Sequence, residues 1–420
     1  MRVLYVNHTD VVSGGERSLL ILLQALRDRV DPLLATPPGA LALRAQELGV
    51  PTTRITGTAG SLRLHLLHTP RALAQMSLAA GQVRRAARRH GAELVHANSI
   101  RAGLILALAH PASPTVVHIR DCLPAGALSR ATMRVIAASA TAIVANSQYT
   151  ADGVTRLAPT ARPHVVHNPV DLARFDPTRI DRATARARLS SELGEASARR
   201  LTLGVVAQIS PWKGQDQAIE TLRILVEQGV DAQLLVIGSA KFAFSATRYD
   251  NNAYLAELRA RVASANLNDR VFWLGEREDV PELMSSLDML LLPSHEEPFG
   301  RAVIEAMALG IPVLATNVGG PVEIVRHSRE GFLLSPREPA AWAAAACEIA
   351  DHPDLARRLG AAGRERAQSF TPERHADAML AVYEAARMQA RRRRSPPPAG
   401  AAGEEGARGE DGARGEDGVA

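Results

Sequence analysis

The 420-residue chain has few cysteines and no long hydrophobic run. Cys122 and Cys347 are its only cysteines, and they form no CxxC pair. This excludes a disulfide framework and a cysteine-based zinc site, and it indicates a reducing compartment. Every apolar run is shorter than the ~20 residues that a membrane-spanning helix needs. The start MRVLYVNHTD has too short an apolar stretch for a secretory signal. We therefore expect a cytoplasmic protein.

Several motifs of common enzyme sites are also missing. The sequence contains no GxxxxGK[ST], GxG or GxSxG motif. This argues against a P-loop nucleotidase, an NAD oxidoreductase of the usual kind and a serine hydrolase. No DxD occurs either, which removes the commonest carboxylate pattern for holding a metal-bound nucleotide sugar. We expect no metal site.

Positive charge is concentrated in the N-terminal part of the chain. The whole chain has a formal net charge of +5, whereas residues 1–175 alone contain 19 Arg against 9 Asp and Glu. Such a basic half attracts nucleic acid, anionic lipid surfaces or phosphorylated small molecules, and charge alone does not separate these. A general preference for Arg, of which the chain has 47, is the competing explanation.

Short apolar runs alternate with amphipathic stretches, which is typical of β-α units around parallel sheets. We predict an α/β protein with two Rossmann-like domains at 1–170 and 201–370, joined by an Arg-rich connection at 171–200. The expected strands are 2–7, 93–97, 115–119 and 142–145, then 201–207, 233–237, 270–274, 288–292 and 312–315.

The C-terminal end has two parts. An amphipathic helix is expected at 371–390. Residues 391–420 repeat GARGED and have almost no large apolar side chains, so we expect a disordered tail. Arg391–Arg394 would make it either an electrostatic tether or a solvated extension.

Two loops after predicted strands have the features of phosphate-binding turns. Ser13-Gly14-Gly15 precedes a helix, where backbone N–H groups and the helix dipole favour an anion, although Ser13 is also an ordinary N-cap. Lys213 follows the strand at 201–207 and is one of only two Lys in the chain. A compact ammonium at this place suits a diphosphate. Each of these signals is weak by itself.

The most informative segment is LLPSHEEPFGRAVIEAMALGIPVLATNVGGPVEIV, residues 291–325. Glu297 lies in the loop before a helix, and Glu305 lies about two turns into that helix. Two carboxylates so placed reach different parts of one long ligand, and carboxylates accept hydrogen bonds from vicinal hydroxyls. This pattern indicates recognition of a sugar or a ribose.

The order of these motifs, with His118 in TVVHIRD and Asn168 in HNPVDLARF, resembles the retaining glycosyltransferases of family 4. The resemblance covers about residues 1–390. It implies a GT-B architecture, in which two Rossmann-like domains face each other across a cleft and the final helix returns to the N-terminal domain.

The resemblance also implies residue roles on the donor side. Lys213 would contact the donor diphosphate, together with backbone amides near Phe299, Gly300 and Arg301. Glu305 would hold the ribose hydroxyls.

Further roles are implied around the reacting sugar. Glu297 would hold its hydroxyls, and His118 would lie beside it. Gly14 and Gly15 would approach the donor phosphates from the opposite domain.

One position departs from the family pattern. The family usually has an Arg in the loop before the Lys, and the matching residue here is Gln208. This removes a fixed charge from the diphosphate site. Arg301 is the first candidate to replace it.

The expected reaction is transfer of a sugar from a nucleotide diphosphate sugar to an acceptor hydroxyl, with retention and without a cofactor or metal. The alternatives are a nucleotide-sugar 2-epimerase and a non-catalytic nucleotide-sugar-binding protein. We expect an anionic or lipid-linked acceptor and no nucleic-acid partner. The basic segment 62–90 would either contact the inner membrane face peripherally or form a domain helix with a solvated basic face. The base, the sugar, the acceptor and the oligomeric state stay open.

Overall fold

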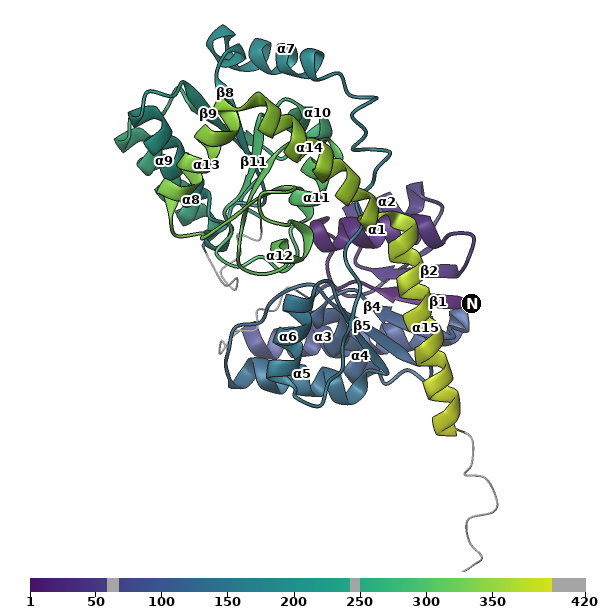
Figure 1. The fold of residues 1–420 in the computed structure, drawn as a ribbon. Helices are drawn as coiled ribbons and strands as arrows, with labels where there is room; N and C mark the ends of the chain where they lie inside the picture. Colours follow the sequence, from purple (N-terminus) through teal and green to yellow (C-terminus); the bar gives the residue numbers. More distant parts are fainter. Residues whose placement is uncertain (59–67, 242–249, 395–420) are drawn as a thin grey trace, which may run out of the picture.

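The computed structural model describes residues 1–58, 68–241 and 250–394. Within these ranges the chain forms two α/β domains, which lie one above the other in Figure 1. No helix of the described ranges is both long and apolar enough to cross a membrane.

The N-terminal domain is built on a parallel sheet with the strand order β3-β2-β1-β4-β5-β6-β7. Its central strands are buried along their whole length, because helices cover both faces of the sheet. Its strands are β1 (Arg2–Val6), β2 (Asp31–Thr36), β3 (Thr52–Arg54), β4 (Leu94–Ala97), β5 (Thr115–Ile119), β6 (Ala142–Ala145) and β7 (His164–Val165).

Two helices of this domain begin after serines that cap their first turn. Ser99 and Ser147 each accept a hydrogen bond from the backbone N–H three residues on, which satisfies an otherwise unpaired donor. The helices are α1 (Gly14–Leu26), α2 (Ala40–Glu47), α3 (His68–His90), α4 (Ile100–Ala109), α5 (Ala127–Ser139) and α6 (Gln148–Leu157).

The C-terminal domain repeats this design with the parallel strand order β10-β9-β8-β11-β12-β13. Its strands are β8 (Leu201–Val206), β9 (Ala232–Ile237), β10 (Val271–Gly275), β11 (Met289–Leu292), β12 (Val313–Thr316) and β13 (Gly331–Leu334). Its helices are α7 (Arg182–Leu193), α8 (Gln215–Glu227), α9 (Asn251–Ser264), α10 (Val280–Ser285), α11 (Arg301–Ala308), α12 (Pro321–Ile324), α13 (Pro339–Asp351) and α14 (Pro353–Ala367), with short 3-10 turns at Glu195–Ala198, Pro211–Lys213 and Gln368–Phe370.

The predicted connection at 171–200 contains a helix of the second domain. In α7, Ala185 and Leu189 are buried, and the helix packs on α10. Arg182 and Arg186 both pair with Asp288, at 2.7 and 2.8 Å. The sequence did not indicate this helix, because its buried face consists of only two apolar side chains, Ala185 and Leu189, among arginines.

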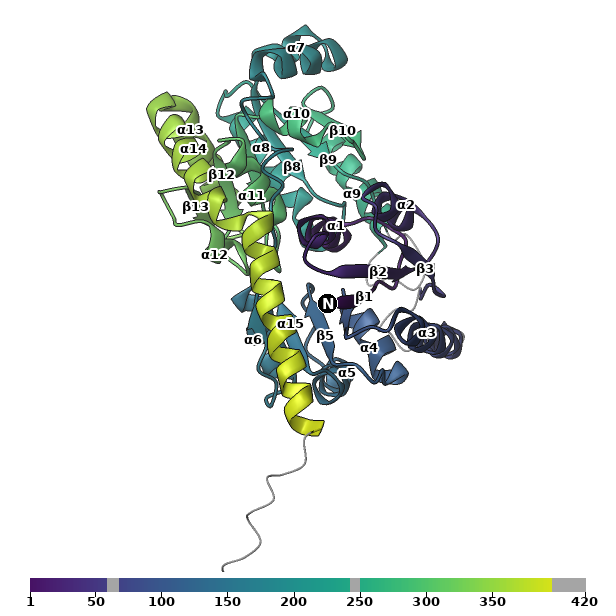
Figure 2. The same ribbon diagram turned by 90° about the vertical axis from the view of Figure 1, so that its right-hand side faces the viewer.

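The chain then returns to the N-terminal domain through α15 (Pro372–Arg394), which Figure 2 shows running down beside α1 and β5. Met379, Val382 and Tyr383 are buried in the same cluster as the inner face of α1. Burying three such side chains stabilises the contact by roughly 1.5–3 kcal/mol each. The helix runs past the predicted end at 390, so 391–394 are helical and not part of a tail; 395–420 lie outside the described residues.

Four strands were absent from the sequence prediction: β2, β3, β7 and β13. β3 and β7 have three and two residues, and neither contains a buried residue. Such short edge strands exist through pairing with a neighbour, so their own sequence carries little signal.

Three histidines, His96, His118 and His375, are buried between the sheet and α15. Burial lowers the pKa of each ring, to about 3 for His375, and the nearby charge of Arg120 lowers it further. All three are therefore neutral in the folded protein at physiological pH.

This arrangement predicts acid sensitivity. An unperturbed histidine has a pKa of about 6.5, so below this pH the three rings bind protons in the unfolded chain but not in the folded one. The free energy of unfolding therefore decreases as the pH falls. We expect a loss of up to about 1.4 kcal/mol per pH unit for each histidine, measured by urea unfolding from pH 7.5 to 5.5. His375→Asn should reduce the slope, and the exposed control His110→Asn should not. A free energy of unfolding that stays constant over this range would contradict the prediction.

Candidate functional site

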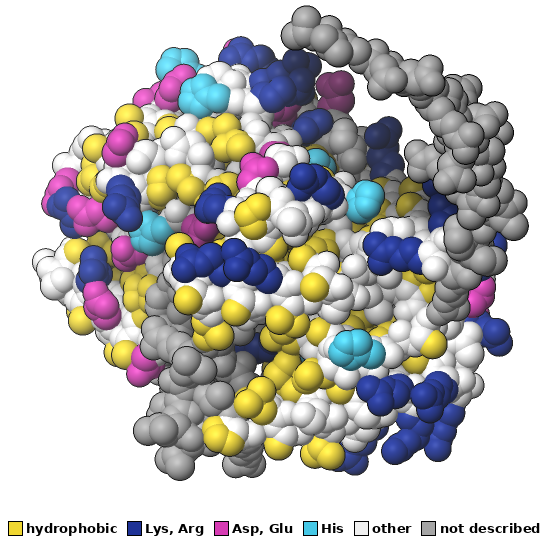
Figure 3. Space-filling view, turned by 90° about the horizontal axis from the view of Figure 1, so that it is seen from below, with side chains coloured by type: hydrophobic (Ala, Val, Ile, Leu, Met, Phe, Trp, Pro, Cys, Tyr) yellow, Lys and Arg dark blue, Asp and Glu magenta, His cyan; other side chains and the backbone are white. Residues whose placement is uncertain are grey.

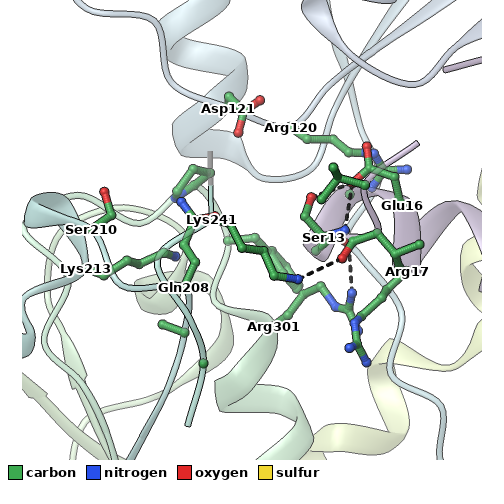
Figure 4. A pocket seen from close by; sticks show the side chains of 18 of the residues that line it. Ser13, Glu16, Arg17, Arg120, Asp121, Gln208, Ser210, Lys213, Lys241 and Arg301 are labelled. Atoms are coloured by element: carbon green, nitrogen blue, oxygen red, sulfur yellow. Dashed lines mark hydrogen bonds between the residues drawn. The ribbon is translucent and has the colours of Figure 1, made fainter. Parts of the chain in front are cut away.

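A cavity of about 880 Å³ lies between the two domains. Its walls are loops that follow the carboxyl ends of β1, β4 and β5 in one sheet and of β8, β9 and β11 in the other. The strand order reverses between β1 and β4 in one sheet and between β8 and β11 in the other, and ligands bind at such points in doubly wound folds. Figure 4 shows side chains of both domains around this cavity.

The first turn of α1 faces the cavity. Ser13 and Glu16 form a reciprocal capping box, in which the Glu16 carboxylate accepts from the backbone N–H and hydroxyl of Ser13. The backbone N–H groups of Gly14 and Gly15 have no protein acceptor among the described residues. Two free donors at a helix N-terminus form a local site for an anion.

Lys213 and Glu297 meet on the C-terminal wall. The Lys213 Nζ donates to Glu297 Oε2 at 2.7 Å, and only 13% and 7% of these side chains is exposed. Ser294 Oγ also donates to this carboxylate, at 2.9 Å. Gly214 follows with φ of 70°, and a Cβ there would lie 2.0 Å from the Pro293 carbonyl, so only glycine fits.

Arg301 and Glu305 lie one turn apart on α11, and Arg301 reaches both its own helix and the other domain. Its Nη2 donates to Glu305 Oε1 at 2.6 Å, while its Nη1 donates to the carbonyl oxygen of Gly14 at 2.7 Å. The Arg301 charge is therefore already balanced by a carboxylate. The second bond joins the C-terminal wall to the first turn of α1.

Gln208, Phe299 and Gly300 complete the predicted donor wall. All three line the cavity. The Phe299 ring is buried and stacks on His167 at 5.7 Å between ring centroids, so this residue offers its backbone to the cavity. Gly300 has φ of 104° and is the N-cap of α11.

The role of His118 beside the reacting sugar stays a prediction. This side chain is fully buried within β5 and does not line the cavity. Its Nδ1 accepts a hydrogen bond at 3.1 Å from Nη2 of Arg120, and Arg120 is the residue on the wall. Arg120 follows β5 directly and reaches the cavity, because side chains inside a parallel strand are buried whereas the first residues beyond its carboxyl end line the ligand site. The sequence could have indicated Arg120, because this residue directly follows the predicted strand 115–119.

Lys241, the other lysine of the chain, also lies in the cleft. It pairs with Glu276, and its Nζ donates to the Val12 carbonyl of the other domain at 3.2 Å. Both lysines of this chain therefore line the cavity (Figure 4).

The electrostatics of the cavity favour an anion. Burial lowers the pKa of Arg120 to about 10 and that of Arg17 below its usual value, and the neighbouring Arg301 adds to both shifts. These groups are still charged at neutral pH. In the parts of the chain that the structure describes, no group of three or more His, Cys, Asp or Glu side chains is placed to hold a metal ion.

Two family models match the chain. The model described as Glycosyltransferase Family 4 matches residues 12–174, and the model described as Glycosyl transferases group 1 matches residues 192–366. Together they span most of the sequence. The chain belongs to glycosyltransferase family 4.

Among curated relatives of this family 4 protein are two D-inositol 3-phosphate glycosyltransferases. The one from Streptomyces scabiei is 35% identical over 230 residues, 55% of this chain and 50% of the relative. The one from Jonesia denitrificans is 32% identical over 256 residues, 59% of this chain and 58% of the relative. The chain thus spans about half the length of the curated relatives it matches.

Solved structures share the whole fold. Anabaena HepE, crystallised with UDP-glucose, has a TM-score of 0.77 at 24% identity and covers 92% of this chain and 100% of its own. Sucrose-phosphate synthase from Thermosynechococcus elongatus has a TM-score of 0.73 at 22% identity, with 91% and 98% covered. The predicted GT-B fold of this family 4 protein is confirmed, whereas the roles assigned to its site residues stay predictions.

The buried Lys213–Glu297 pair leads to a prediction about stability. Lys213→Met leaves the Glu297 carboxylate buried without its cation, and we expect a loss of about 3 kcal/mol in urea unfolding. The double variant Lys213→Met with Glu297→Gln should recover most of this loss, because no charge is then left unpaired. Strictly additive losses in the two single variants and the double variant would contradict the pairing.

Proposed function

We propose that this protein transfers a sugar from a nucleotide diphosphate sugar to an acceptor hydroxyl, with retention of anomeric configuration and without a metal ion. One observation carries the proposal. A single interdomain cavity of a GT-B fold brings together the first turn of α1, with its unpaired backbone N–H groups, and the side chains of Lys213, Glu297, Arg301 and Glu305.

The chemistry of such a transfer suits this cavity. The bond between the anomeric carbon and the diphosphate oxygen breaks, so negative charge grows on the leaving nucleoside diphosphate. Cations and N–H dipoles already in place stabilise that charge more in the transition state than in the ground state. The N–H groups of Gly14 and Gly15 are such groups, and Lys213, which is paired with Glu297, adds an ammonium to the same cavity. In this proposal they provide what a metal ion provides elsewhere.

Retention follows in the proposal from attack on the same face that the diphosphate leaves. The acceptor oxygen bonds to the anomeric carbon and passes its proton to an oxygen of the departing phosphate. The enzyme then needs no nucleophile of its own. Hydrogen bonds from Lys213 and Ser294 fix the Glu297 carboxylate in position, which supports a role in holding sugar hydroxyls.

A uridine nucleotide is the first donor to test, because HepE was crystallised with UDP and with UDP-glucose. We expect one member of a panel of UDP-, GDP- and ADP-sugars to raise the melting temperature, since ligand bound at 100 times its Kd stabilises a protein by about 2.7 kcal/mol. Slow release of nucleoside diphosphate should accompany it, and EDTA should change neither result.

The outcomes of this panel separate the competing functions. Lys213→Ala and Glu305→Ala should bind the donor more weakly and release less product. Conversion of the donor sugar to its 2-epimer without release would favour the epimerase, and binding without turnover, with any acceptor offered, would favour a binding protein. No response to any donor would refute the proposal.

A phosphorylated acceptor is the second part of the proposal. Inositol 3-phosphate appears in the names of the curated relatives. On the N-terminal wall, Arg101 lines the cavity and its Nη1 contacts the uncharged ring of His8 at 3.3 Å. Burial lowers the pKa of His8 to about 3, so this ring stays neutral and does not balance the charge of Arg101. The charge of Asp121, on the same wall, acts on Arg101 without forming an ion pair with it in the described part of the chain.

We therefore expect Arg101→Gln to raise the KM for inositol 3-phosphate roughly tenfold, the effect of one lost charge-assisted hydrogen bond. The donor KM should stay constant. Raising the salt concentration should also lower turnover with this acceptor. Equal turnover with unphosphorylated inositol, unchanged by salt, would contradict an anionic acceptor.

Peripheral contact with the inner membrane face completes the proposal. Residues 62–67 of the basic segment 62–90 lie outside the described residues, but α3 exposes Leu73 and Leu78 together with Arg85, Arg88 and Arg89. Figure 3 shows basic and hydrophobic side chains side by side on the lower face of the molecule. Sedimentation with phosphatidylglycerol vesicles but not with phosphatidylcholine vesicles is expected. Equal sedimentation with both lipids, or with neither, would refute the contact.

A further inference from the structure

We propose that Arg120 supplies, from the N-terminal domain, the diphosphate-binding cation that this chain lacks at Gln208. The inference rests on the proposed function and adds to it a residue that is absent from the donor motifs. Three properties of Arg120 support it: its burial, its uncharged partners and its place opposite Arg301.

Arg120 is a buried cation held by uncharged groups. Only 7% of the residue is exposed. Its Nε donates to Asn98 Oδ1 at 3.0 Å, its Nη2 donates to His118 Nδ1 at 3.1 Å, and its Nη1 donates to Asn168 Oδ1. His118 stays neutral because burial and the Arg120 charge both lower its pKa. These bonds orient the guanidinium without balancing its charge.

Two other arginines with little exposed side chain have carboxylate partners. Arg301 pairs with Glu305, and Arg200, far from the cavity, pairs with Asp269 at 3.1 Å. The acidic group whose charge acts most on Arg120 is Glu16, and the Glu16 carboxylate already accepts hydrogen bonds from Ser13 and Asn7. A buried charge without a counterion costs free energy, which a bound anion returns.

The position of Arg120 points to the donor phosphates. A Cβ on Gly15 would lie 3.2 Å from Cδ of Arg120, so the first turn of α1 rests against this side chain. Arg301 contacts the same turn from the other domain, through the Gly14 carbonyl (Figure 4). A helix N-terminus and two guanidiniums therefore converge from opposite walls on one part of the cavity.

Of these two guanidiniums, Arg120 is the one that donates hydrogen bonds only to uncharged groups among the described residues. Arg301, the first candidate to replace the family arginine, is balanced by Glu305. Gln208 lines the same cavity and carries no charge. A cation contributed by the N-terminal domain would bind the diphosphate only when both domains are close together, so Arg120 would couple donor binding to closure of the cleft.

The test compares Arg120→Gln, Arg120→Lys and the double variant Arg120→Gln with Gln208→Arg. The probes are UDP and UDP-glucose, or the nucleotide that the donor panel identifies. We expect Arg120→Gln to weaken UDP binding in calorimetry, and to lower kcat/KM, by roughly 10- to 100-fold. Arg120→Lys should keep part of the affinity, because it keeps the charge. Gln208→Arg should restore most of it in the Arg120→Gln background.

Arg200→Gln is the matched control, since it removes a buried arginine outside the cavity. It should lower the melting temperature without changing UDP affinity. If Arg120→Gln binds UDP as tightly as wild type, or if it raises only the KM for a phosphorylated acceptor, the inference is wrong while the proposed function stands. Failure of Gln208→Arg to restore binding would also count against it. If the wild type itself binds no nucleoside diphosphate, the proposed function falls and this inference falls with it.

Discussion

Cations from both domains converge on the first turn of α1, and the interdomain arrangement depends on keeping them there. Arg301 and Lys241 come from the C-terminal domain and donate to the carbonyls of Gly14 and Val12. Arg120 approaches the same turn from β5. Like charges in a partly buried cavity repel one another more strongly than in water. Glu305 and Glu276 neutralise two of these cations, and a bound anion would neutralise the third.

A second set of contacts holds the domains together on the opposite side of the cleft. Glu323 of α12 accepts hydrogen bonds from the backbone N–H groups of Gln148 and Tyr149, at the N-terminus of α6 in the other domain. The carboxylate also contacts His167 at 3.0 Å, and the carbonyl of His167 lies 2.7 Å from the ring of His375 on α15. A carboxylate at a helix N-terminus is stabilised by the helix dipole. The returning helix α15 thus belongs to the same network as this interdomain contact.

Sequence reasoning succeeded where a local pattern is also a physical requirement. Continuous apolar runs predicted the central strands, because parallel strands are buried on both faces. The spacing of Glu297 and Glu305 placed one in a loop and one on a helix, which is where the structure has them. It failed for β3 and β7, whose residues have no pattern of their own, and for α7, whose arginines hide a narrow buried face.

The fold, the family and most of the cavity wall could be predicted from the sequence, since loops after buried strands must meet at the carboxyl edge of each sheet. Which cations have a carboxylate partner could not be predicted, because this depends on the three-dimensional packing. In the structure Arg120 lies on the cavity wall and donates to the buried His118, and Arg301 is paired with Glu305. The tertiary structure also brings both lysines to one cavity from separate loops. Charge balance is a property of neighbours in space, and residues that are distant in sequence become neighbours only when the two domains meet.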